Sequence, residues 1–405
     1  MLFIITFFLI FGWKVNTYID ISAVAACALS LQYLLIHKEQ YNNLKNPNII
    51  ALFLLTIYSL IIVLSTGITD LYPFTRAARA LVMIIASFSL YSLYQKHYKD
   101  PILKICEHIY LSIFIHSILM IIMYCSDSFR LFIYSFTHSD DYANLFTPYL
   151  QGYRIGGLTY GLSQTSVLQM FGLVLIPVIY GKISNKIFKF FLILSITPIV
   201  ISSMFGGRSG LFFSIFLLPL YLLLKIKYSK FNLNKRTLLK IFLLIIISFI
   251  TLSSISFRYL PPKFRSFTLT TSNEIIDVFK NKSKTFNDVM NMYFMPKSMI
   301  TTIFGMGNYG RTKTFNLPSD VGWIKSIFAI GIIGVILMLF PFIWGISKAF
   351  ASIDKLKDFS FAVIIIFLAS IMLNCKELAL LTRNQWTIQA IFLVILSNTK
   401  YKKDA

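Results

Sequence analysis

The sequence predicts an all-α, polytopic membrane protein with about twelve spans and both ends in the cytoplasm. Three observations predict this fold: an apolar excess, long apolar runs separated by short polar segments, and lysine in alternate connections. Of the 405 residues, 57% are hydrophobic and 13% are charged, whereas soluble domains have about 45–50% and about 25%. The excess apolar surface therefore has to face something other than water.

A transmembrane helix needs about 20 mostly apolar residues. The runs that meet or approach this length, within a single membrane domain over 1–405, are 1–17, 20–36, 49–66, 79–95, 104–125, 162–181, 188–204, 210–225, 239–257, 322–343, 359–374 and 385–398. The first run is the weakest because its continuous apolar stretch stops at Lys14. It lacks the basic start and the small-residue cleavage site of a signal peptide, so we expect a retained span.

Lysine orients these spans, because short cytoplasmic loops carry an excess of Lys and Arg. With the N-terminus inside, every short region on that side is basic, as at Lys38, Lys182 and Lys402. Two long loops fall on the outer side, at about 126–161 and 258–321. The formal charge of +22 thus comes largely in blocks between apolar runs, a pattern of membrane loops rather than of nucleic-acid binding.

Arginine is distributed differently from lysine. Of the ten arginines, only Arg236 is placed inside. The nine predicted on the outer side are Arg76, Arg79, Arg130, Arg154, Arg208, Arg258, Arg265, Arg311 and Arg383. A guanidinium binds phosphate or carboxylate through two parallel hydrogen bonds. We therefore expect recognition of a lipid-linked phosphate or pyrophosphate, with head-group contact as the alternative for any single arginine.

Two segments combine arginine, glycine and the start of a span. Gly-Gly-Arg-Ser-Gly at 206–210 predicts a sharp turn that places Arg208 at a helix N-terminus, where free N–H groups favour anions. Arg-Ile-Gly-Gly-Leu at 154–158 places Arg154 just before the span at 162–181. The alternatives are a plain tight turn and a plain loop-to-helix junction.

A third pair, Arg76 and Arg79, lies at helical i,i+3 spacing and should share one helix face. Tyr72 and Pro73 precede the pair and indicate a sharp start to that helix. Two roles are therefore considered for this pair, which are anion binding and anchoring at the lipid head groups.

The outer side also carries carboxylates that could act as a base toward a hydroxyl acceptor. Asp320 falls in Pro-Ser-Asp-Val-Gly-Trp at 318–323, at the mouth of a span, and is either a functional carboxylate or an N-cap. Glu377 lies close to Arg383 in the last outer turn. For Glu377, a structural salt bridge is as reasonable as a catalytic role.

Other patterns give weaker signals. The segment 305–310 matches G-x-G-x-x-G, but no strand precedes it, so we expect a flexible or anion-binding turn that ends in Arg311 rather than a dinucleotide site. His108 and His116 lie in one predicted span and would favour a transporter if they formed a proton relay. No metal or cofactor is implied, since neither cysteines nor paired carboxylates have ligand spacing.

Together, these segments resemble the bacterial O-antigen polymerases of the Wzy type. The chain shares with them its length, its many spans and its two large outer loops. The segments that carry the resemblance are Arg-Ile-Gly-Gly-Leu at 154–158, Gly-Arg-Ser-Gly at 207–210, and Asp-Val-Gly-Trp at 320–323 leading into Gly-Ile-Ile-Gly at 331–334. The shared arrangement of spans and loops covers most of the chain, whereas the shared residues are confined to these short segments.

The resemblance implies a GT-C-like glycosyltransferase, multi-pass in the bacterial inner membrane and active at its periplasmic face. It would join undecaprenyl-pyrophosphate-linked repeat units, alongside a flippase and a chain-length regulator. Arg154, Arg208 and Asp320 match the segments expected to line the catalytic site. The other candidates are assigned to substrate binding because they are charged and fall on the predicted outer side of the membrane. They are Arg76, Arg79, Arg258, Arg265, Arg311, Glu377 and Arg383.

Two other functions remain open. O-antigen ligases resemble this family but carry a histidine in the large periplasmic loop, and this chain has no histidine after Asp140. A flippase should have charged residues in many spans and a two-half pseudo-repeat, and neither is evident. The polymerase is therefore the expectation that the sequence favours.

Overall fold

A computed structural model describes residues 1–13, 20–36, 44–67, 71–137, 155–159, 161–207, 209–228, 284–310 and 316–399. Throughout these ranges the regular elements are helices, with no strand, which confirms the all-α class. Six helical stretches are long and apolar enough to cross a membrane: Pro47–Thr66, Tyr72–His97, Pro101–Cys125, Leu162–Tyr180, Lys186–Gly206 and Gly322–Ala351. Shorter apolar helices lie at Leu2–Phe11, Ile21–Leu35, Phe212–Lys225 and Asp358–Leu373. The chain is therefore a membrane-embedded helical protein.

The helices correct several predicted boundaries. The span 188–204 is two helices, α8 (Lys186–Leu194) and α9 (Ile196–Gly206), consistent with Pro198, which cannot donate a helical hydrogen bond. The long outer loops are partly helical, since they contain α6, α13 and α14, whose bounds are Asp127–Thr137, Lys284–Asn291 and Met299–Phe304. The predicted span 239–257 lies outside the described residues.

The chain packs as two compact units, each described by itself. Unit 1 contains residues 1–13, 19–112 and 289–405, and unit 2 contains 14–18 and 113–288. The long helix α5 (Pro101–Cys125) contributes its first half to unit 1 and its second half to unit 2.

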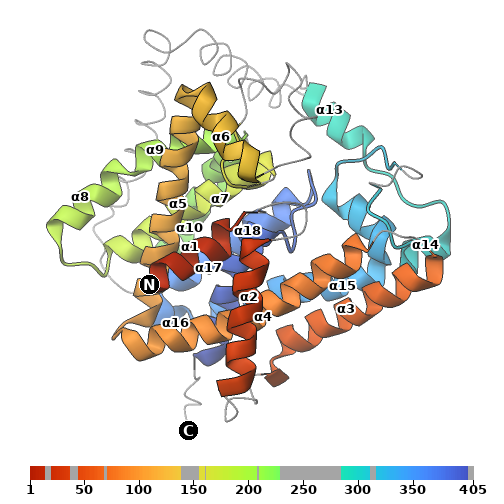
Figure 1. Cartoon of the computed structure of the whole chain (residues 1–405), viewed down its shortest axis with the longest axis horizontal. Coiled ribbons are helices and arrows are strands. Elements are labelled where there is room, and N and C mark those ends of the chain that lie inside the picture. The colour runs from red at the N-terminus through yellow and green to blue at the C-terminus, as the bar shows by residue number, and fades with distance from the viewer. Residues whose placement is uncertain are drawn as a thin grey trace. The chain divides into compact units, whose positions relative to one another are not determined.

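Unit 1 is built around α4 (Tyr72–His97), which packs against three other helices. These are α2 (Ile21–Ile36), α3 (Pro47–Thr66) and α18 (Arg383–Asn398). The remaining helices of unit 1 are α1 (Leu2–Phe11), α14, α15 (Gly322–Ala351), α16 (Ile353–Leu356) and α17 (Asp358–Leu373). Figure 1 shows α3 and α15 running side by side, with α14 at one end of the pair.

The predicted outer ends of the unit 1 helices come together. Asn384 Nδ2 at the start of α18 donates to Ile10 O at the end of α1 at 2.5 Å, and Trp323 N at the start of α15 donates to Asn374 O after α17 at 3.2 Å. We call this the arginine end, because the described arginines of unit 1 lie here. Its orientation in the membrane stays a prediction.

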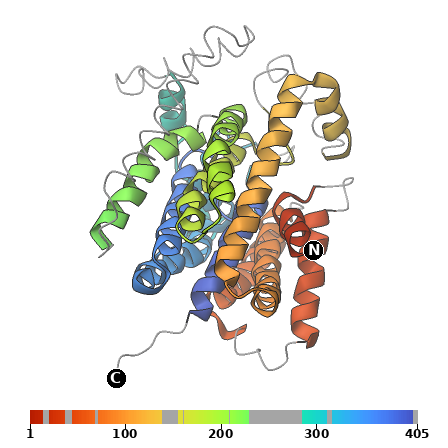
Figure 2. The same cartoon turned by 90° about the vertical axis from the view of Figure 1, so that its left-hand side faces the viewer.

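Unit 2 contains the second half of α5 with α6, α7 (Leu162–Tyr180), α8, α9 and α10 (Ser209–Tyr228). The chain turns sharply between α5 and α6 (Figure 2). Small residues let α7 approach α9 and α10 closely. A Cβ on Gly206 would lie 2.9 Å from Ser166 N and 3.0 Å from Leu162 O, and both are backbone atoms of α7.

The close approach at Gly206 gives a test of this packing. We expect Gly206→Val to destabilise unit 2 by about 1–3 kcal/mol, because the added side chain overpacks against main chain that cannot move aside. The measurement is the thermal midpoint of the detergent-solubilised protein. The control is Gly67→Asn, since Gly67 ends α3 at φ 63° with nothing near its Cβ position and Asn tolerates that conformation. Equal midpoints for Gly206→Val and wild type would contradict the packing.

Candidate functional site

The structure brings three of the predicted arginines together at the arginine end of unit 1. Arg76 and Arg79 lie in the first turns of α4, which begins at Tyr72 with Pro73 as its second residue, as predicted. Arg383 is the first residue of α18. Arg79 interacts electrostatically with Tyr72, with the two other arginines and with the carboxylate of Asp20. We call these three arginines the arginine cluster.

An ion pair fixes Arg383. Its Nη1 lies 3.0 Å from Oδ2 of Asp20, and the two side chains are only 12% and 14% exposed. The other oxygen of Asp20 accepts from Ala23 N at 3.2 Å, at the start of α2. Sequence reasoning expected a possible salt bridge between Glu377 and Arg383, but the described partner of Arg383 is Asp20. Glu377 lies half-buried in the turn before α18.

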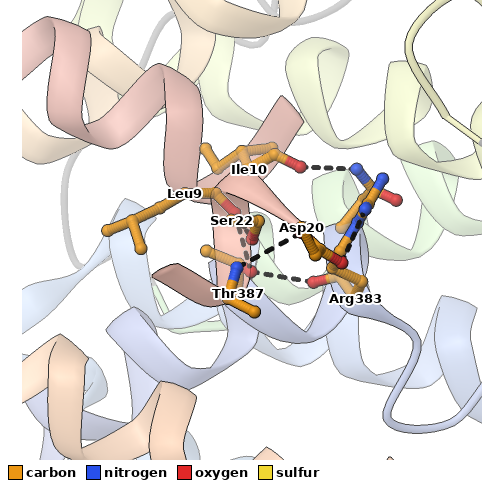
Figure 3. A network of polar contacts seen from close by, with 8 residues as sticks. Leu9, Ile10, Asp20, Ser22, Arg383 and Thr387 are labelled. Carbon is orange, nitrogen blue, oxygen red and sulfur yellow. Dashed lines mark hydrogen bonds and ion pairs between the residues drawn. The ribbon is translucent and has the colours of Figure 1, made fainter. Parts of the chain in front are cut away.

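Figure 3 shows how this ion pair is embedded in a polar network that joins α1, α2 and α18. Ser22 Oγ donates to Leu9 O at 2.7 Å, and Thr387 Oγ1 donates to the same carbonyl at 3.3 Å. The last carbonyls of α1, which have no partner within their own helix, are thus used to dock the other two helices. The network therefore fixes the start of α2, next to Asp20, and the start of α18, which carries Arg383, against the end of α1.

Arg76 is buried and bound on two sides. Its Nε donates to Leu380 O at 3.1 Å, and its Nη2 donates to the same oxygen. The guanidinium carbon lies 5.8 Å from the centre of the Tyr309 ring. Asn374 holds the loop that presents this carbonyl, because its Oδ1 accepts from Ala379 N and from Leu380 N.

Arg79 has no such partners. Among the described residues, none accepts a hydrogen bond from it and none forms an ion pair with it. The cluster thus places three guanidinium groups beside one carboxylate, and that carboxylate is already paired with Arg383. An anionic group that approached Arg79 would meet uncompensated positive charge and unused donors. The arginine cluster is therefore suited to binding a phosphate or a carboxylate.

Asp320 lies at the same end of unit 1, but no described contact joins it to the arginine cluster. Its side chain is 77% exposed and pairs with Lys325 Nζ at 3.0 Å. It is not the N-cap of α15, because Val321 holds that position and Ser319 Oγ accepts from Val321 N. The N-cap interpretation of Asp320 is wrong, and its carboxylate faces solvent.

In unit 2, the two predicted Arg-Gly segments lie next to each other. Ile155 N donates to Phe205 O at 2.9 Å, so the segment after Arg154 is bound to the end of α9 just before Arg208. We call this contact the motif junction. Arg154 and Arg208 themselves lie outside the described residues, as do Arg258, Arg265 and Arg311.

The turn at 206–210 is as sharp as predicted, since α9 ends at Gly206 and α10 begins at Ser209. One of the N–H groups expected to face an anion is already used, because Gly210 N donates to Ser166 Oγ at 2.9 Å. Ser166 Oγ in turn donates to Gly207 O at 2.7 Å. The turn is therefore anchored to α7 through Ser166.

Two side chains hold the segment 155–159 at the motif junction. Gly156 N donates to Tyr134 Oη at 3.3 Å, and burial raises the pKa of Tyr134, so the phenol stays protonated at neutral pH. Leu158 N donates to His116 Nε2 at 3.0 Å. Gly157 has φ 61° and lies directly against the His116 ring, where a Cβ would clash. Glycine is required at this position because the backbone is left-handed and because a side chain would collide with the His116 ring.

The other ring nitrogen of His116 contacts α7, because Nδ1 lies 2.7 Å from Gln169 Nε2. Ser117 Oγ donates to Gln169 Oε1 at 2.7 Å and to Ile113 O at 2.9 Å. This buried polar chain joins α5 to α7 and to the segment 155–159.

Sequence reasoning missed the partners of both histidines, which come from other helices. His108 Nδ1 lies 2.5 Å from Tyr94 Oη, which lies 2.8 Å from Thr6 Oγ1. This polar chain connects α1, α4 and α5 inside unit 1. Helical spacing within one segment carries no information about such partners. Among the described residues, no group of three or more His, Cys, Asp or Glu side chains could hold a metal ion.

The ion pair between Asp20 and Arg383 generates a second test. We expect Asp20→Asn alone to cost roughly 3 kcal/mol of stability, because it leaves a buried guanidinium without its partner. The double variant Asp20→Asn with Arg383→Gln should recover part of that loss. The thermal midpoints of both single variants and of the double variant measure this coupling, and strictly additive midpoints would show that the pair does not interact.

The structure brings predicted functional residues together in the arginine cluster, and at the motif junction it joins the described parts of the two Arg-Gly segments. No family model matches the chain, and no curated protein is significantly similar to it. We therefore infer function from the geometry of these two places.

Proposed function

We propose that this protein is a bacterial O-antigen polymerase of the inner membrane. It joins undecaprenyl-pyrophosphate-linked oligosaccharide repeat units at the periplasmic face. The observation that carries the proposal is the arginine cluster, in which Arg79 has no partner among the described residues and shares a single carboxylate with two other arginines. This excess of positive charge at the end of a membrane-embedded bundle suits the pyrophosphate of a lipid carrier.

In the proposed reaction, a sugar hydroxyl of the acceptor repeat unit attacks the anomeric carbon of the donor glycan. The bond between that carbon and the pyrophosphate oxygen breaks, and the lipid pyrophosphate leaves with the bonding electrons. Guanidinium groups stabilise the negative charge that develops on the leaving group. Arg79, which has no hydrogen-bond or ion-pair partner among the described residues, makes this contact, while Arg76 and Arg383 are held in place by Leu380 O and Asp20.

We assign the acceptor proton to Asp320. Its carboxylate is exposed at the same end of unit 1 and is therefore accessible to a sugar hydroxyl. Gly322 allows the adjacent start of α15 to pack closely against Asn374 and against Glu377 O, and Asn374 also positions Leu380. The loop between α17 and α18 thus helps to position both Asp320 and the arginine cluster. Arg154 and Arg208 lie outside the described residues, and we propose substrate contacts for them from their sequence segments alone.

The alternative is a transporter for the lipid-linked repeat unit. The observation that favours it is the polar chain from Thr6 through Tyr94 to His108, because buried ionisable groups in membrane helices often carry protons. A ligase that transfers finished polymer is a further alternative, since it uses the same donor chemistry.

Lipopolysaccharide from a strain that lacks the gene separates these functions. A ladder that collapses to core plus one repeat unit is expected for a polymerase. Core alone with accumulated lipid-linked polymer would indicate a ligase, and core without such polymer would indicate a flippase. An unchanged ladder would contradict a role in O-antigen assembly.

Complementation of that strain tests the arginine cluster. We expect Arg79→Ala to reduce long-chain polymer by roughly ten- to a hundred-fold, because a hydrogen bond to a charged group contributes about 1.5–3 kcal/mol. Arg79→Lys should restore part of it, since lysine keeps the charge but not the fork of donors. The matched control is Lys96→Ala, an exposed cation at the opposite end of α4. Normal chain length with Arg79→Ala at wild-type protein levels would refute the proposed contact.

A further inference from the structure

The segment 296–310 lies in the long connection that the sequence assigned to the aqueous outer side. It contains α14, the six-residue helix at 299–304, followed by the glycine turn at 305–310. The end of α14 and the residue pair that follows it contact α3 and α15 at Tyr58 and Phe328, short of the ends of these two membrane helices.

Two independent contacts give the depth of this segment. Tyr58 Oη donates to Phe304 O at 3.1 Å, and Tyr58 lies eight residues before the end of α3, about 12 Å along the helix axis. Met306 N donates to Phe328 O at 2.7 Å, and Phe328 lies six residues after the start of α15, about 9 Å along that axis. Both helices are apolar and long enough to span a bilayer core of about 30 Å. The end of α14 therefore lies about 9–12 Å from the ends of these two helices, measured along their axes.

The backbone of the turn satisfies the condition for irregular structure at that depth, which is that its polar groups find partners within the protein. Gly305 N donates to Thr301 O at 2.8 Å, and Gly307 N donates to Ala329 O at 2.9 Å. Gly331 breaks α15 at φ 61° just after the two carbonyls that accept from the turn. These N–H groups are accordingly not available to an anion. The G-x-G-x-x-G pattern here serves close packing of a turn against a broken helix.

The exposed side chains of α14 are apolar. Met299 is 77% exposed, Ile300 is 72% exposed and Phe304 is 48% exposed. The neighbouring helices carry exposed apolar side chains of the same kind, among them Ile57 and Ile61 on α3 and Ile332, Ile333 and Ile336 on α15. The exposed face of α14 thus continues the lipid-facing surface of the two spans.

We propose that residues 296–310 form a re-entrant membrane element, in which Met299, Ile300 and Phe304 contact lipid acyl chains. From Gly305 the chain rises toward the arginine end. Gly307 lies against Val63 and Thr66 near the end of α3, and Tyr309 reaches Arg76 and the ring of Tyr72. The element therefore connects the interior of the leaflet directly to the arginine cluster. The inference does not depend on the proposed function.

Spin-label accessibility in liposomes tests the insertion. Single cysteines at Ile300 and Met299, in the full chain with the native cysteines replaced, are labelled and exposed to oxygen and to a water-soluble nickel complex. Ile57→Cys on the exposed face of α3 is the membrane reference, and Asp288→Cys on exposed α13 is the aqueous reference. We expect the oxygen-to-nickel ratio at both α14 positions to match Ile57→Cys. A ratio that matches Asp288→Cys, or a label immobilised and shielded from both reagents, would overturn the proposal.

A second comparison needs no cysteine replacement. Ile300→Asp should lower the yield of membrane-inserted, monodisperse protein several-fold, because it places a charge among acyl chains. Met290→Asp places the same charge on the exposed face of α13 and should leave the yield close to wild type. Equal yields for the two variants would contradict insertion of α14.

Discussion

The arrangement of unit 1 at the arginine end depends on the need to pair buried guanidinium groups. A buried arginine without a partner costs several kcal/mol, whereas one with good geometry can hold distant elements together. Arg383 ties α18 to Asp20 at the start of α2, and Arg76 ties α4 to the loop before α18. Both bonds occupy acceptors beside the cluster. Arg79 is then left with positive charge on both sides and no described acceptor, which makes it the natural contact for an anionic ligand.

A second constraint is that irregular backbone in an apolar environment must satisfy its own N–H and C=O groups. The chain solves this in the same way in both units. In unit 2, the segment 155–159 donates to Phe205 O, Tyr134 and His116. In unit 1, the turn at 305–310 donates to α15 carbonyls next to the break at Gly331. In both places glycine permits the close approach, so glycine-rich motifs that suggest ligand binding in sequence also have a structural role.

Composition and apolar run length were sufficient to predict the all-α membrane class, because a span has a fixed length and few charges. The i,i+3 spacing of Arg76 and Arg79 and the start of α4 at Tyr72 were predictable for the same local reasons. The partner of Arg383 was not, since Asp20 is 363 residues away in the chain and Glu377 is closer in sequence. The partners of His108 and His116 were hidden in the same way. The insertion of α14 escaped prediction because six residues are too short to register as a span.

The central claim is that the arginine cluster recognises a lipid-linked pyrophosphate through Arg79. The most direct measurement is native mass spectrometry of the purified protein with a polyprenyl pyrophosphate, and with the uncharged polyprenol of the same length as the reference. The account predicts that wild type retains the pyrophosphate in preference to the polyprenol, and that Arg79→Ala loses this preference while Lys96→Ala keeps it. Equal retention of the pyrophosphate by wild type and Arg79→Ala would contradict it.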